Sequence, residues 1–223
     1  MAVYDTTRAI EVDACVPCSL FWFDSHENVR LRPQAVLDLF RLVSATAKAP
    51  RRTLASSFNC PRCSRALVYS HDLQRTTRFT YWRCPRDFGQ LITYQQFLRE
   101  KNFVRTPSAA EIARLRETIR QINCSQCGAS IDLATDTACT HCGSPIALID
   151  PDGVAKTLSD LTMDRAGTPS ADRDAARAAL TDAQIDAIFE LHRMEDDGGE
   201  RDLLAVGLAA VGGWLARQLA SRE

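Results

Sequence analysis

Eight of the nine cysteines in this 223-residue chain fall into Cys-x-x-Cys pairs, and this pattern constrains the fold more than any other feature. Two thiolates at this spacing can chelate one zinc ion from a tight turn, and a tetrahedral ion then needs two further ligands. The opening segment, MAVYDTTRAIEVDA, lacks the apolar run of a secretion signal, so we expect a cytoplasmic chain with reduced thiols rather than disulfides. The pairs are Cys15 with Cys18, Cys60 with Cys63, Cys124 with Cys127, and Cys139 with Cys142, while Cys84 stands alone.

The last two pairs form a complete zinc-ribbon pattern. Eleven residues separate Cys127 from Cys139, and a glycine follows each pair, where a chain reversal needs a positive φ. Short strands are predicted after each pair, at 129–133 and 145–149. Because so short a segment cannot bury a core, a zinc ion must contribute to its folding energy. We therefore predict a structural site made by four thiolates: Cys124, Cys127, Cys139 and Cys142.

The remaining cysteines do not form a regular ribbon. Cys60 and Cys63 precede a predicted hairpin, with strands at 66–70 and 78–83, that leads to Cys84. A regular ribbon would carry a second cysteine or a histidine at position 87, where this chain has Asp87.

Three ligand sets are open for these cysteines. The first joins Cys15 and Cys18 to Cys60 and Cys63 in a split four-thiolate site, and it is favoured because closed structural zinc sites use cysteine and histidine rather than a lone carboxylate. The second completes Cys60, Cys63 and Cys84 with Asp87 or His71. The third leaves one pair without a metal ion. We expect two zinc ions per chain.

The segment CPRCSRALV…YWRCPRDFG resembles the zinc ribbons related to transcription factor TFIIB that occur in small bacterial proteins. In that family a Trp-x-Asp-x-x-Glu tail follows the second cysteine pair, whereas here Trp22, Asp24 and Glu27 follow Cys18, so the two halves stand in reversed order. The stretch from FLREKNFVR to LIDPDGVAKTL is also similar to uncharacterised bacterial zinc-ribbon proteins, in which a histidine is expected near the position of Phe88. The resemblance covers residues 10–160 and implies a fold and a metal, not an activity.

Helical periodicity and capping complete the predicted fold. Helices are predicted at 32–48, 93–104 and 106–122, and Ser108 with Glu111 forms a capping box for the last of these. The fold class is therefore α+β: two small zinc-ribbon β-hairpin modules packed with several α-helices, and a helical C-terminal part. Three parts follow: a split-ribbon domain at 1–106, a helix with a four-cysteine ribbon at 107–150, and an acidic helical tail with an apolar terminal helix at 151–223.

Charge and hydropathy patterning suggest the partners. Residues 48–105 hold 12 Lys and Arg against 3 Asp and Glu, whereas residues 150–223 hold 8 against 15. The uncharged run 203–216 would span about 21 Å as a helix, less than the roughly 30 Å of a bilayer core. Its small residues favour a docking or oligomerisation helix. A membrane-surface or tail-anchoring segment and an ordinary core helix are the alternatives.

The motifs favour a protein that is not an enzyme. Four-cysteine sites are closed, whereas catalytic zinc keeps an open position, and the sequence contains neither a phosphate-binding loop nor a His-Glu zinc-protease motif. We expect a protein-interaction adaptor that docks through its C-terminal helix or a ribbon surface and has no small-molecule substrate. One alternative is a nucleic-acid binder that uses the arginines of 48–105 with Phe79, Tyr81 and Trp82, although these arginines can equally be solvated with the aromatics packed inward. The other alternative is a membrane-associated ribbon protein.

Overall fold

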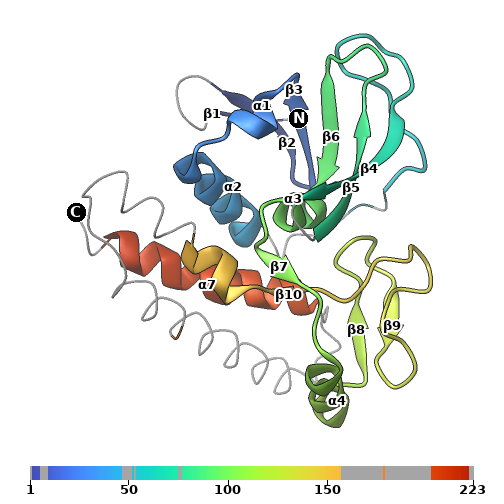
Figure 1. Ribbon diagram of the computed structural model, residues 1–223, viewed down its shortest axis with the longest axis vertical. Helices are drawn as coiled ribbons and strands as arrows, with labels where there is room; N and C mark the ends of the chain where they lie inside the picture. Colours follow the sequence, from blue (N-terminus) through green and yellow to red (C-terminus); the bar gives the residue numbers. More distant parts are fainter. Residues whose placement is uncertain are drawn as a thin grey trace. The chain divides into compact units, whose positions relative to one another are not determined.

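A computed structural model describes residues 2–5, 10–46, 52, 54–74, 77–156, 178 and 202–220. The chain forms two compact units, residues 1–102 and residues 103–223 (Figure 1). The part of the predicted acidic tail at 157–201 lies outside the described residues, apart from position 178.

The first unit is built on a six-stranded antiparallel sheet in the order β1-β2-β3-β6-β5-β4. Its two central strands come from distant parts of the chain: Leu20 pairs with Thr93 and Trp22 with Leu91. The sheet thus lies wholly within the region predicted to be one split-ribbon domain, and it is larger than the hairpin predicted there. The strands are β1 (Ala2–Asp5), β2 (Glu11–Cys15), β3 (Leu20–Asp24), β4 (Val68–Gln74), β5 (Thr77–Arg83) and β6 (Gly89–Thr93).

One face of this sheet packs on an aromatic core. Phe21 and Phe23 of β3 are fully buried, and their ring centroids lie 5.2 and 5.9 Å from that of Phe97. Phe97 belongs to helix α3 (Tyr94–Glu100), whose N-terminus is capped where the Thr93 hydroxyl accepts a hydrogen bond from the Gln96 amide. Helices α1 (Glu27–Arg30) and α2 (Pro33–Ala45) complete the unit.

The opposite face of the sheet carries the first group of cysteines. Trp22, Leu91 and Trp82 pair in a row across β3, β6 and β5, so they point to the same face. The buried thiols of Cys60 and Cys84 pack in one cluster with Trp22 and Leu91. The half-buried side chains of that cluster include Cys15, Cys18, Cys63, Phe58 and Leu67.

The second unit combines a small ribbon with α-helices. Strands β8 (Gln121–Asn123) and β9 (Ser130–Asp132) form a hairpin, and β7 (Val104–Arg105) pairs with β10 (Leu148–Ile149). Helix α4 (Ala109–Thr118) begins with the predicted capping box, in which the Ser108 hydroxyl accepts from the Glu111 amide and Glu111 accepts from the Ser108 amide. It ends before the predicted limit because the chain turns into β8. Residues 151–156 are helical, near the end of the ribbon.

Helix α7 (Leu203–Ala220) is an integral part of this second unit. Leu203 joins the core cluster that also contains Ile131, Leu133 and Leu148, so the start of the apolar run is a core helix. A β-carbon on Gly207 would lie 3.2 Å from the Ile149 side chain, which shows why a small residue suits this packing. No described helix is both long and apolar enough to cross a membrane.

The α+β class predicted from the sequence is confirmed, and both predicted ribbon regions contain β-hairpins next to cysteines. The difference lies in the N-terminal region, where β2, β3 and β6 extend the β4–β5 hairpin into one large sheet. β3 has four consecutive buried residues, so it shows no alternation that would identify it as a strand.

Candidate metal centres

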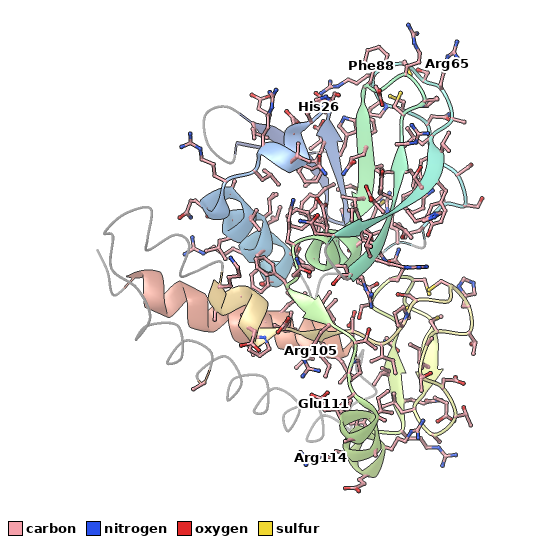
Figure 2. All side chains as sticks on the ribbon, viewed as in Figure 1. His26, Arg65, Phe88, Arg105, Glu111 and Arg114 are labelled. Carbon is pink, nitrogen blue, oxygen red and sulfur yellow. The ribbon has the colours of Figure 1, made fainter. Side chains whose placement is uncertain are left out.

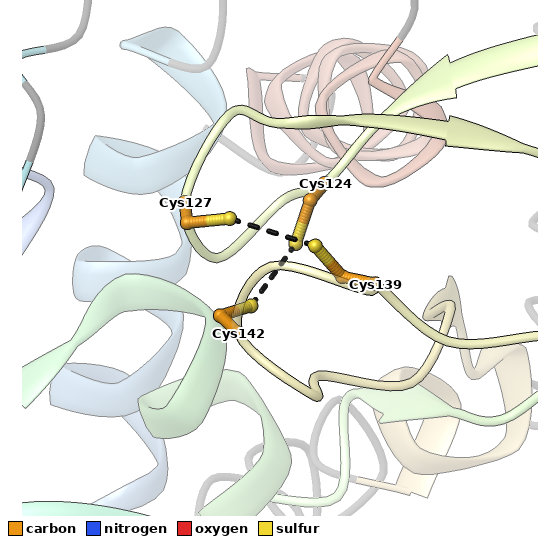
Figure 3. A group of neighbouring side chains, drawn as sticks. All are labelled: Cys124, Cys127, Cys139 and Cys142. Atoms are coloured by element: carbon orange, nitrogen blue, oxygen red, sulfur yellow. Dashed lines mark hydrogen bonds between the residues drawn. The ribbon is translucent and has the colours of Figure 1, made fainter.

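The second unit brings four thiols together at the end of the β8–β9 hairpin. The sulfur atoms of Cys124 and Cys142 lie 3.6 Å apart, and those of Cys127 and Cys139 lie 3.7 Å apart (Figure 3). All four lie within 4.8 Å of one another. In a tetrahedral site with Zn–S distances of about 2.3 Å, sulfur atoms lie about 3.8 Å apart. The two measured sulfur–sulfur distances therefore match those of a four-thiolate zinc site.

Two matching turns position these thiols. In each turn the glycine amide donates to the carbonyl of the first cysteine: Gly128 to Cys124 at 2.7 Å, and Gly143 to Cys139 at 2.8 Å. Both glycines have positive φ, 78° and 71°, as the spacing predicts. The local sequence thus determines the geometry of each turn.

The first of these turns is tied to helix α7. The Ser125 hydroxyl, between two of the cysteines, donates to the Asp202 carboxylate at 2.6 Å. Asp202 also accepts from the amides of Leu204 and Ala205, so it caps the helix. The cap and the metal turn therefore share one buried carboxylate.

The first unit brings three thiols together, not four. Cys60, Cys63 and Cys84 lie within 4.8 Å of one another, and the sulfur atoms of Cys63 and Cys84 are 3.5 Å apart. Cys60 and Cys84 are buried and Cys63 is half-buried. This cluster, which we call the Cys60 trio, also suits a thiophilic metal ion.

The favoured split site is not what the geometry brings together. Cys15 and Cys18 pack against the same hydrophobic cluster, but neither belongs to the group of three thiols. Cys84 joins Cys60 and Cys63 instead of the Cys15/Cys18 pair. It directly follows β5, which pairs with β6, and its thiol packs on the same sheet face as Trp22 and Leu91. Neither Asp87 nor His71 belongs to the group, and both side chains are exposed.

The Trp-x-Asp-x-x-Glu motif organises the surroundings of the Cys60 turn. The Trp22 indole donates to the Asp24 carboxylate at 2.8 Å, and the Asp24 amide donates to Glu27 at 2.7 Å. Arg62, inside the turn, donates two hydrogen bonds to Asp24, at 2.8 and 2.6 Å. This pair lowers the pKa of Asp24, while burial raises the pKa of Glu27. The motif thus anchors the Cys60 turn to β3.

The surroundings of Cys84 lower the pKa of its thiol. Burial opposes its ionisation, but hydrogen bonds from the amides of Arg86 and Phe88 and from the neighbouring thiols lower its pKa to about 7. Metal ligation requires the thiolate form, so this environment favours a metal ligand.

The hairpin beside the Cys60 trio exposes both arginines and apolar side chains. Arg65, Arg78, Arg83 and Arg86 are exposed, and Figure 2 shows Arg65 and Phe88 at the same end of the first unit. Of the three aromatics named for nucleic-acid binding, Phe79 is buried, and Tyr81 and Trp82 are half-buried. The exposed aromatic side chains here are instead Tyr69 and Phe88, which were not predicted. Tyr69 lies directly opposite Trp82 on β5, and their ring centroids are 5.2 Å apart.

Comparisons with protein-family models, curated proteins and solved structures found no match to this chain.

Proposed function

We propose that this chain is a non-catalytic zinc-ribbon protein that binds two zinc ions and serves as a protein-interaction adaptor. The two thiol clusters support the metal assignment, since sulfur-rich tetrahedral geometry favours zinc over harder ions. The four-cysteine cluster has a complete ligand set, and such closed sites stabilise small folds rather than catalyse.

The exposed edge strand β4 is the observation that carries the adaptor role. β4 is the last strand of the six-stranded sheet, and all but one of its side chains are exposed. Val68, Tyr69 and Leu73 keep 45%, 59% and 55% of their surface accessible. Exposed apolar side chains on a strand edge are typical of a surface that pairs with another chain. The C-terminal helix is a weaker candidate, because Leu203, Leu208 and their buried neighbours already pack inside the second unit.

The chemistry around β4 indicates the kind of partner. Arg83 and Arg78 lie directly opposite Val68 and Leu73 on β5, and both are exposed. Asp72 is the single acidic residue on the strand. We therefore propose an extended protein segment with acidic and apolar side chains, which would add a strand to β4.

The metal assignment is tested by native mass spectrometry of the full chain, where two zinc ions per chain are expected. One ion would limit metal binding to one of the two clusters, and three would mean that a further site exists outside them. Alkylation of the seven thiols in the two clusters should be slow in the zinc-loaded protein until a chelator is added.

The adaptor surface is tested by screening the zinc-loaded chain against displayed acidic–apolar peptides. Binders are expected, and Tyr69→Glu and Leu73→Glu should each weaken them at least about tenfold, because they place charge on the docking edge. Val29→Glu is the matched control, since Val29 is a 74% exposed apolar residue on α1. If the control variant and the β4 variants lost peptide binding equally, β4 would not be the docking surface.

The exposed arginines favour a second candidate function, binding of single-stranded nucleic acid. Arginines interleaved with the exposed rings of Tyr69 and Phe88 suit phosphates and stacked bases. A labelled oligothymidine should then bind with an affinity that falls steeply with salt, and Arg78→Glu with Arg83→Glu should abolish binding. Absence of binding at low salt would remove this candidate.

A further inference from the structure

Four turns in this chain hold a cysteine in the same backbone arrangement. In each, the amide of the first cysteine donates to the carbonyl five residues later: Cys60 to Arg65, Cys84 to Gly89, Cys124 to Ala129, and Cys139 to Ser144. In each, the amide two residues after the first cysteine also bonds to its sulfur. Cys84 therefore begins a metal-binding turn like the other three.

The second amide bonded to the sulfur identifies the position of the second ligand. In three turns this amide belongs to the second ligand itself: Cys63, Cys127 or Cys142. In the Cys84 turn it belongs to Phe88, one residue further along. The extra residue, Asp87, has a φ of 57° and is exposed. Phe88 thus occupies the place of a ligand, and its ring cannot bind a metal ion.

The thiols of Cys15 and Cys18 pack against the same hydrophobic cluster but lie outside the group of three. Among the described residues, no fourth Cys, His, Asp or Glu belongs to the group formed by the Cys60 trio. The Phe88 side chain reaches the surface, because it is 40% exposed, and the exposed Arg86 guanidinium lies over its ring at 5.4 Å from the centroid. A ligand from outside the chain can therefore approach at this point.

We propose that a metal ion bound by Cys60, Cys63 and Cys84 keeps a fourth, exchangeable coordination position beside Phe88, which takes an external thiolate or imidazole ligand. This inference rests on the proposed metal binding by the trio. It distinguishes the two centres of the chain: the four-cysteine site is closed, and the trio exchanges a ligand. An external thiolate would join the ion without displacing a protein ligand.

Cobalt substitution of the full chain tests this proposal. Cobalt(II) in a tetrahedral thiolate site has visible bands that respond to the identity of each ligand, and the closed four-cysteine site serves as an internal control. Titration with imidazole, and separately with 2-mercaptoethanol, should shift the bands of the trio in a saturable manner. Cys84→Ser, which removes one of the trio, should lose that response while the bands of the other site remain.

Two substitutions at position 88 form the matched pair. Phe88→His places a nitrogen ligand in the chain, so its cobalt form should no longer respond to either added ligand. Phe88→Leu keeps an apolar residue there and should respond like the natural chain. If Phe88→His remains as responsive as Phe88→Leu, position 88 is not the ligand position and the proposal fails.

The remaining outcomes separate this proposal from the metal assignment. One cobalt ion per chain by native mass spectrometry, retained in Cys84→Ser, would overturn both. Two ions with no response to added ligand would overturn only the exchangeable position. If Cys15→Ser or Cys18→Ser then made the cobalt bands respond to added ligand, the thiol removed by that substitution would be the fourth ligand of the Cys60 trio. The site would then be a rearranged form of the split site.

Discussion

Replacement of Asp202 by alanine should strongly destabilise the second unit, because this side chain has two roles at the start of α7. Asp202 is only 4% exposed, and its carboxylate accepts hydrogen bonds from Leu204, Ala205 and Ser125 at 3.0, 3.1 and 2.6 Å. The substitution therefore removes the helix cap and the link to the cysteine turn together.

The expected cost follows from these two roles. Loss of an N-cap side chain costs about 1 kcal/mol, and loss of a hydrogen bond to a charged group costs about 1.5–3 kcal/mol. We expect Asp202→Ala to lower the free energy of unfolding by about 2–4 kcal/mol. Asp202→Asn retains a capping oxygen and should lose only about 0.5–1 kcal/mol, because it gives up the charge at the positive end of the helix.

Urea unfolding of the zinc-loaded full chain, followed by circular dichroism, measures these differences. Ser125→Ala removes the link but leaves the cap, so its cost should be about 1.5–3 kcal/mol, the value for a hydrogen bond to a charged group. In a double-mutant cycle, the two alanine substitutions should cost less together than the sum of the single effects. The shared role of Asp202 would be refuted if Asp202→Ala stayed within about 0.5 kcal/mol of the natural chain, or if the two substitutions were additive.

Two further changes have contrasting expected results. In Gly89→Ala, the added β-carbon would overlap the Phe23 carbonyl and lie 2.8 Å from the Trp22 ring, so the β3–β6 pairing must shift. We expect the free energy of unfolding to fall by at least about 2 kcal/mol. Gly128→Ala, with a positive φ but no atom within 4 Å, should cost only about 1–2 kcal/mol in the same urea unfolding experiment. The hydrogen-bonded Arg105 lowers the pKa of Glu111 to about 2 (Figure 2), so its stabilising effect should be complete above the ordinary carboxyl pKa of 4.5 and decline as the pH falls toward 2. The stability difference between the natural chain and Glu111→Gln should therefore shrink between pH 6 and pH 2.5, and a constant difference would contradict this origin of the shift.

Local features of the sequence are sufficient to predict the four-cysteine site of the second unit. The turn at Cys124 needs only two cysteines three residues apart and a glycine in the left-handed region, and the second turn repeats it. The α4 capping box and the β4–β5 hairpin are equally local, because a few neighbouring residues satisfy their hydrogen bonds. Trp22, Asp24 and Glu27, which the sequence pattern singled out, form a local motif: the Trp22 indole and Arg62 donate to the Asp24 carboxylate, and the Asp24 amide donates to Glu27.

Tertiary structure decided what the first unit does with its five cysteines. The spacing alone allowed Cys15 and Cys18 to meet Cys60 and Cys63, because a metal ion depends on spatial proximity and not on chain order. The β3–β6 pairing, between segments about seventy residues apart, instead brings Cys84 over Trp22 and Leu91. Such pairing depends on the burial of whole strands on both faces, as in β3, which a local pattern does not encode. Thus the sequence by itself determined the closed cysteine site, and only the assembled sheet selected the three thiols of the Cys60 trio and placed Phe88 beside them.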